Sequence, residues 1–176
     1  NAFSPGLVRA LNAALAAIAD DCGVRAVIVT GAGRAFCCGA DLKFLAAHGP
    51  DSPETVAFLR ELNRFIDDLD TLDRPVIGVA NGLVMGGGLE TLLCCDIVMA
   101  GADVTIRDPH ITIGAIHGAG GSQRLARCVG LQRALDLVLS ARSLTAAEAA
   151  LWGIVTRVSH PSALQDDALA LAQEIA

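Results

Sequence analysis

Apolar positions follow two different patterns along this chain, and their alternation predicts an α/β fold. Short, continuous apolar runs rich in β-branched residues are typical of buried strands. They occur at 24–30, 75–80, 96–101, 104–108 and 154–158. Apolar residues at helical spacing fill most of the intervening chain, at 5–20, 52–72, 87–95, up to residue 128, and at 131–140. The strand runs lack polar alternation, so we expect sheets covered on both faces within one domain.

Several helix boundaries carry their own signals. Ser4-Pro5 and Ser52-Pro53 each place a capping serine before a proline, which is typical of a helix start. Thr145 and Glu148 have the spacing of a capping box, and the short helix that follows should end at Gly153. We expect a terminal helix to begin at Pro161. The Gly-rich segments 31–41 and 114–122 are expected to be irregular.

Composition narrows the class of protein. The 176 residues are 53% hydrophobic and 18% charged, which indicates one globular domain. A net charge of −6 argues against a nucleic-acid partner, because such binders need a basic face. The most apolar stretch, 75–89, is shorter than the roughly 20 residues of a membrane span, so no membrane partner is expected. The chain lacks an initial Met and ends inside a predicted helix, from which we expect a piece of a longer protein.

The cysteines indicate a reducing, cytoplasmic location. No C-x-x-C spacing is present, which disfavours a zinc or dithiol site. We therefore expect reduced thiols that behave as small buried hydrophobic residues. The six are Cys22, Cys37, Cys38, Cys94, Cys95 and Cys128.

Three consecutive glycines, residues 86–88, precede a predicted buried helix and are the first candidate for chemistry. Glycine costs about 1 kcal/mol inside a helix, so bare backbone must serve a purpose here. The first N–H groups of a helix have no partner within it and attract negative charge. We therefore expect an oxyanion-binding amide at Gly87, with the Glu90 carboxylate on the same helix face. The alternative is that Glu90 only caps its own helix.

A second Gly-rich stretch, 33–43, follows the first predicted strand. It could supply another unpartnered amide, for instance at Ala40, and two donors are the usual number in an oxyanion hole. The alternative is an ordinary loop between a strand and a helix.

Three motifs resemble the enoyl-CoA hydratase/isomerase (crotonase) family, in the order in which that family has them. They are "GRAFCCGADLK" at 33–43, "RPVIGVANGLVMGGGLETLLCCDIVMAG" at 74–101 and "IGAIHGAGGSQRLARCVG" at 113–130. The resemblance implies a fold of repeated β-β-α units, with two roughly perpendicular sheets flanked by helices. It implies a homotrimer or hexamer. Residues 1–176 would form a single crotonase-like domain that lacks the family's N-terminal hairpin and C-terminal helices.

The resemblance also assigns roles. Substrates would be acyl-CoA thioesters, with coenzyme A as part of the substrate and no other cofactor or metal. The amides of Ala40 and Gly87 would bind the thioester oxygen, and Glu90 matches the first of two glutamates used by the family's hydratases. The second glutamate is replaced by His110, which is a departure from the family pattern. Further substrate-binding positions would be Cys38, Asp41, Leu42, Lys43, Gly86, Pro109, Ala115, His117 and Gly118.

His110 has three possible roles: an acid or base, since imidazole titrates near neutral pH, a polar residue that contacts substrate, or a buried histidine without a role. We expect Asp41 and Asp96 to be structural caps and Ser122 to cap the helix after "GAGG". His48 and His160 are expected to be exposed.

These observations predict an enzyme that stabilises a thioester enolate, with hydratase or isomerase first. The alternatives are hydrolytic C–C cleavage of a β-keto acyl-CoA by Glu90 and His110, and a non-catalytic acyl-CoA binder. A serine peptidase is disfavoured, because no serine lies in a recognisable arrangement with a histidine and an aspartate.

Overall fold

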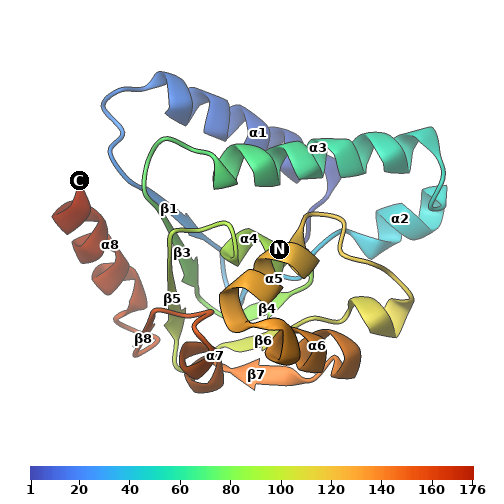
Figure 1. Cartoon of the computed structure of the whole chain (residues 1–176). Helices are drawn as coiled ribbons and strands as arrows, with labels where there is room; N and C mark the ends of the chain where they lie inside the picture. Colours follow the sequence, from blue (N-terminus) through green and yellow to red (C-terminus); the bar gives the residue numbers. More distant parts are fainter.

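A computed structural model describes all residues from 1 to 176 and contains two four-stranded sheets surrounded by helices (Figure 1). The first sheet is parallel throughout, in the order β1 (Val27–Thr30), β3 (Val76–Ala80), β5 (Ile97–Gly101) and β8 (Arg157–Ser159). The second has the order β2 (Ala35–Cys37), β4 (Leu83–Met85), β6 (Thr105–Arg107) and β7 (Ser143–Thr145), with only β7 antiparallel.

The chain passes between the two sheets in a repeated unit. A strand of the first sheet is followed by a strand of the second and then by helix, which is the expected β-β-α repeat. The helices are α1 (Pro5–Asp20), α2 (Leu42–His48), α3 (Pro53–Asp70), α4 (Gly87–Leu92), a 3-10 turn η1 (His110–Ile113), α5 (Gly121–Val129), α6 (Leu131–Ser140), α7 (Ala146–Trp152) and α8 (Leu164–Ile175). None of them is long and apolar enough to cross a membrane.

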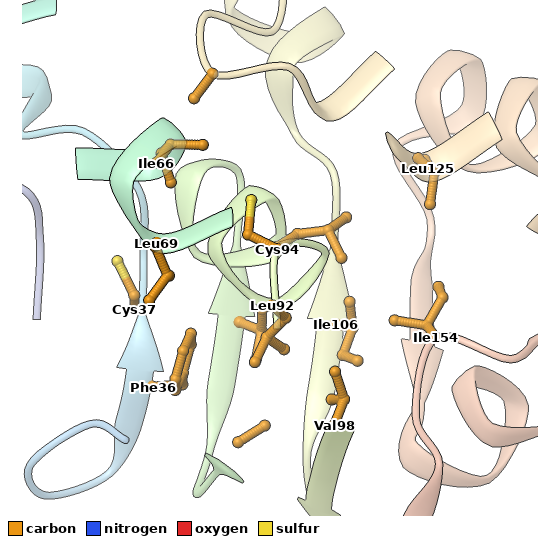
Figure 2. Packing of buried hydrophobic residues seen from close by; sticks show 14 of the residues in the cluster. Phe36, Cys37, Ile66, Leu69, Leu92, Cys94, Val98, Ile106, Leu125 and Ile154 are labelled. Atoms are coloured by element: carbon orange, nitrogen blue, oxygen red, sulfur yellow. The ribbon is translucent and has the colours of Figure 1, made fainter. Parts of the chain in front are cut away.

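The central strands β3 and β5 of the first sheet are largely buried, as their apolar runs predict. All five residues of β3 are buried. Ile77 and Val79 pack against α8 through Leu164 and Leu171, while the other face belongs to the main core. Figure 2 shows part of that core, with Leu92 of α4 between side chains of β2 and β6. The short α4 is therefore anchored in the centre of the molecule.

Three predicted helix starts are confirmed by their hydrogen bonds. The Ser4 and Ser52 hydroxyls accept the N–H groups of residues three positions later, and each proline occupies the first helical turn. Thr145 and Glu148 form the reciprocal capping box.

Other predictions on local structure are wrong. The terminal helix begins at Leu164, because residues 161–163 form a turn after Pro161. Ser122 lies inside α5 and makes no cap, since Gly120 is the residue at the N-cap position. The segment 31–41 is not wholly irregular, because it contains β2. All six cysteines are free, but Cys22, Cys38 and Cys128 are exposed and only Cys37 and Cys94 are fully buried.

Candidate active site

The three consecutive glycines allow α4 to begin against neighbouring backbone. Gly86 has φ of +50°, which disfavours a residue with a side chain. A Cβ on Gly88 would lie 2.3 Å from the Cys37 carbonyl oxygen, and one on Gly87 would lie 3.2 Å from the Phe3 ring. Bare backbone is therefore needed so that the first turn of α4 can pack against the end of β2 and the start of the chain.

The Ala40 amide is left without a partner by the pairing on either side of it. Cys38 donates its N–H to the Asn1 carbonyl at 2.9 Å, and Asp41 donates its N–H to the Phe3 carbonyl at 2.9 Å. Of the two amides between them, that of Gly39 donates to Sγ of Cys37 at 3.4 Å, whereas that of Ala40 forms no intramolecular hydrogen bond. Neighbouring N–H groups of extended backbone alternate in direction, so the Ala40 N–H is directed away from the chain start.

The Gly87 amide lies beside this segment. Gly87 is the first residue of α4, and its N–H has no acceptor within the helix. A Cβ on Gly39 would lie 3.0 Å from the Gly87 nitrogen, and Gly39 has φ of +86°. Glycine at 39 thus lets the two segments approach, and both amides line one cavity.

Glu90 is buried, with 3% of its surface exposed, and one of its carboxylate oxygens already accepts two hydrogen bonds. Oε1 accepts the N–H groups of Ala119 and Gly121, each at 2.9 Å. Oε2 has no such donor and lies 4.0 Å from Nε2 of His110. The carboxylate is therefore bound to the loop before α5 and does not cap its own helix, which removes the capping alternative.

Gly121 makes this contact possible. A Cβ there would lie 2.6 Å from Cδ2 of His117, 2.7 Å from Cγ of Glu90 and 2.9 Å from Oε1 of Glu90. The glycine at the start of α5 thus leaves room for both side chains. The same loop is linked to α3, because Arg124 donates to the Ala119 carbonyl at 2.9 Å and to the Asp70 carboxylate at 2.9 Å.

Asp108 is the central residue that the sequence analysis missed. It follows β6 directly and is 1% exposed. Its Oδ1 accepts a hydrogen bond from Nδ1 of His110 at 2.6 Å, and its Oδ2 accepts one from Nε2 of His117. The available signal was an aspartate at the end of a strand, two residues before His110, which the resemblance places where the family's hydratases have a glutamate.

The electrostatics of this cluster favour an ionised Asp108. Burial opposes ionisation, but the hydrogen bonds that His110 and His117 donate outweigh it and hold the pKa of Asp108 well below its usual range. The hydrogen bond to Asp108 raises the pKa of His117 above 6.5, although burial works against this. The rings of His110 and His117 lie with their centroids 4.4 Å apart. One negative charge is thus shared by two imidazoles.

A cavity of about 380 Å³ brings most of the predicted residues together. Glu90, His110 and the two amides open onto it, and its apolar walls come from α2, α3 and the η1 region. Of the predicted positions it is lined by Cys38, Ala40, Leu42, Gly86, Gly87, Glu90, Pro109, His110, Ala115 and Gly118.

Three predicted positions lie outside the lining. Asp41 instead caps α2 by accepting the N–H groups of Lys43 and Phe44. Lys43 is exposed. His117 lies behind the cavity against Asp108. Asp96 has the expected structural role, because it accepts the Val76 N–H at 2.8 Å.

Asp108, His110 and His117 also have potential metal-ligand atoms within 4.8 Å of one another. Both oxygens of Asp108 are already hydrogen-bonded to the two imidazoles, so the three residues satisfy one another. The prediction that no metal is needed stays a prediction.

In chemical terms the cavity offers two backbone donors and two side-chain groups. The donors suit a carbonyl oxygen that gains negative charge. The carboxylate and the imidazole suit a water molecule or a proton in transit between carbon atoms.

Comparison with known proteins agrees with this geometry. A sequence model described as enoyl-CoA hydratase/isomerase matches residues 1–176. A probable mitochondrial enoyl-CoA hydratase of Dictyostelium discoideum is 37% identical over the whole chain, which spans 62% of that protein. A probable enoyl-CoA hydratase of Rhizobium meliloti is 38% identical, and the chain spans 67% of it.

The fold comparison gives the same result. The crystal structure of an enoyl-CoA hydratase from Bacillus anthracis superposes with a TM-score of 0.95 at 34% identity, covering 99% of this chain and 67% of that one. The predicted fold class is confirmed by this likeness and by the two sheets. The chain spans about three fifths to two thirds of these three relatives. With its glycine-bordered amides and its buried Glu90 on one cavity, the chain belongs to the enoyl-CoA hydratase/isomerase family.

Proposed function

We propose that this chain forms the catalytic part of an enzyme that stabilises the enolate of an acyl-CoA thioester, most directly by adding water to a 2-enoyl-CoA or by moving its double bond. One observation supports this above the others: two unpartnered amides and the free oxygen of Glu90 line the same cavity.

The amides of Ala40 and Gly87 would bind the thioester oxygen. Negative charge develops on that oxygen when a nucleophile adds to the β-carbon or a base removes an allylic proton. Backbone donors held in place by packing need no reorganisation at that moment, and one such donor is worth about 3 kcal/mol of barrier. Gly39, Gly86 and Gly88 hold the two donors in register.

Glu90 and His110 would handle the water and the proton. In hydration, the water oxygen bonds to the β-carbon while Oε2 of Glu90 accepts a water proton, and the enolate charge goes to the oxyanion hole. Oε2 then gives the proton to the α-carbon, so that the carboxylate is regenerated. In isomerisation the same oxygen would move one proton between two carbons, and His110 would only contact substrate.

A second candidate is hydrolytic C–C cleavage of a β-keto acyl-CoA. The observation that favours it is the hydrogen bond between Asp108 and His110, because such a pair can activate water against a second carbonyl. A non-catalytic binder is disfavoured, because burying the Glu90 carboxylate is costly and binding alone does not require it.

The test is to incubate the purified protein with a short trans-2-enoyl-CoA and to follow the absorbance of the conjugated thioester. We expect a loss of absorbance matched by 3-hydroxyacyl-CoA. A 3-enoyl-CoA that gains conjugation would establish isomerisation instead. Cleavage of a 3-ketoacyl-CoA without activity on either enoyl ester would overturn the first proposal in favour of the second.

We also propose a homotrimer or hexamer that acts in the cytoplasm without a further cofactor. Leu131, Leu139 and Leu151 of α6 and α7 are 59%, 62% and 76% exposed, and contact between subunits would cover such a surface. Light scattering of the purified protein tests the assembly. Two of the relatives are named as mitochondrial, so the compartment requires fractionation of the source cells.

A further inference from the structure

We infer that Asp108 is a positioning residue that makes His110 act in place of a carboxylate. It fixes the imidazole so that an unprotonated Nε2 faces the cavity, and water is then held by two acceptors, Oε2 of Glu90 and Nε2 of His110. This inference rests on the proposed function, and it names the groups that bind the water.

The direction of the Asp108–His110 hydrogen bond follows from charge. An ionised carboxylate can only accept hydrogen bonds. Oδ1 of Asp108 lies 2.6 Å from Nδ1 of His110, so Nδ1 must carry the proton. Neutral imidazole has one protonated nitrogen, which leaves a lone pair on Nε2. Asp108 also accepts the His110 backbone N–H at 3.3 Å, which restrains both ends of the histidine.

The second acceptor for the water is a single oxygen of Glu90. Oε1 of Glu90 already accepts two backbone N–H groups, so Oε2 is the carboxylate oxygen available to water. Oε2 and Nε2 of His110 are 4.0 Å apart. A water about 2.8 Å from each would donate to both at an angle of about 90°, near that of its own O–H bonds. Its lone pairs then remain free to attack the β-carbon.

The other tautomer would not serve. A proton on Nε2 would make His110 a donor, so Nε2 could no longer accept a proton of the water, and its N–H would compete for a water lone pair. The imidazole can therefore replace a carboxylate only if its tautomer is fixed from behind. Asp108 is the only side chain that hydrogen-bonds Nδ1 of His110.

His117 completes the arrangement by occupying the second oxygen of Asp108. Three ionisable groups face His110: Asp108, Glu90 and His117. The hydrogen bond to Asp108 raises the pKa of His117, so Asp108 favours the protonated form of His117. With both oxygens engaged, Asp108 cannot rotate away from His110.

The test compares wild type with Asp108→Asn, and uses Asp51→Asn on the exposed α2–α3 loop as the matched control. The first readout is the tautomer of His110 in long-range ¹H–¹⁵N spectra of ¹⁵N-histidine-labelled protein, assigned with His110→Gln. We expect a proton on Nδ1 in wild type and in the control, and a shift toward the Nε2-protonated form in Asp108→Asn. The same tautomer in all three proteins would overturn the inference.

The second readout is kinetic. We expect Asp108→Asn to lower kcat for enoyl-CoA hydration by up to about 10⁴-fold, the loss known when a tautomer-fixing carboxylate is replaced by an amide, with KM changed less than about threefold. In a His110→Gln background the same substitution should cost nothing further, because its effect passes through His110. An equal loss in both backgrounds would indicate a merely structural role and overturn the inference.

These readouts separate the inference from the proposed function. Active wild type without the tautomer shift would leave the function standing and remove Asp108 from it. Wild type that binds enoyl-CoA without converting it, despite a proton on Nδ1, would overturn the proposed function and the water site together.

Discussion

Glu90 and Asp108 are both buried carboxylates, yet they are held in opposite ways. Glu90 is fixed by backbone N–H groups of Ala119 and Gly121 through one oxygen, and its second oxygen faces the cavity. Asp108 is fixed by the side chains of His110 and His117 through both oxygens, and it does not line the cavity. Burial alone therefore does not distinguish the carboxylate that we propose to react from the one that we propose to support it; the oxygen without a hydrogen-bond donor does.

The comparison explains how the site can differ from its family at one position. The family's second glutamate would present its own oxygen to the cavity. Here the negative charge lies on Asp108, behind the cavity wall. The His110 imidazole, which is hydrogen-bonded to Asp108, is the group that lines the cavity. The hydrogen bonds from the Ala119 and Gly121 amides to Glu90, here called the Glu90 clamp, come from the backbone and so do not require a particular side chain at position 110.

The largest expected effect comes from removing the free oxygen. Glu90→Gln keeps the size of the side chain but cannot take up and return a proton, so we expect kcat to fall about 10³- to 10⁴-fold. Binding of a saturated acyl-CoA, measured by calorimetry, should survive. Unchanged turnover in this variant would refute the role of Glu90.

The next effect comes from disturbing the Glu90 clamp by a substitution that leaves both carboxylate residues in the sequence. The methyl group of Gly121→Ala would lie 2.6 Å from His117 and 2.7 Å from Glu90, so both side chains must move. We expect kcat to fall about 100-fold, as misplacement of catalytic groups by about 1 Å commonly costs. Gly6→Ala in α1 is the control, because its methyl would meet only ordinary contact. Equal kcat in the two variants would contradict the clamp.

A third test places a glutamate at position 110, with and without the carboxylate of Asp108 behind it. His110→Glu alone would bring a second carboxylate against Asp108, and like charges at such distance disfavour ionisation of both. The double variant His110→Glu/Asp108→Asn removes that repulsion. We expect its hydration rate to exceed that of His110→Glu about tenfold in the enoyl-CoA assay. A single variant as active as the double one would show that Asp108 does not act on position 110.

The smallest effect is on stability and depends on pH. The folded-state pKa of His117 is raised, so its stabilising effect is fully present below pH 6.5 and is lost as pH rises through that raised pKa. We expect the Tm difference between wild type and His117→Gln, measured calorimetrically, to shrink by about 2–4 °C between pH 6 and 9. His160→Gln, at an exposed position, serves as the control. A difference that grows with pH would be inconsistent with a raised pKa.

The sequence predicted those parts of the fold that depend on local pattern. Long apolar runs such as that of β3, and capping residues such as Ser52, carry their structure within a few residues. The strands β2, β4 and β7 have three residues each, too few to show a period. They form because neighbouring strands pair with them, and that information is not local.

The site divides in the same way. The glycines at 86–88 indicate an unpartnered amide at Gly87. Helix geometry then places Glu90, three residues later, on the same helix face. Asp108 was not predicted, because its significance lies in two histidines that a turn folds back onto it. Nor does any local signal indicate that the amides of Ala119 and Gly121 would hold Glu90, 29 and 31 residues away.

The contact between Glu90 and the loop before α5 also bears on how the protein folds. The segment between Glu90 and its two donors contains β5 and β6, which belong to different sheets. Contacts of such separation form late, because the loop must be closed before they contribute. In a partly folded chain with one sheet incomplete, Glu90 would lack its hydrogen bonds to Ala119 and Gly121, and the proposed active site would not be formed. The proposed activity would therefore report complete folding, and we expect activity regained during refolding to lag behind the recovery of helical structure.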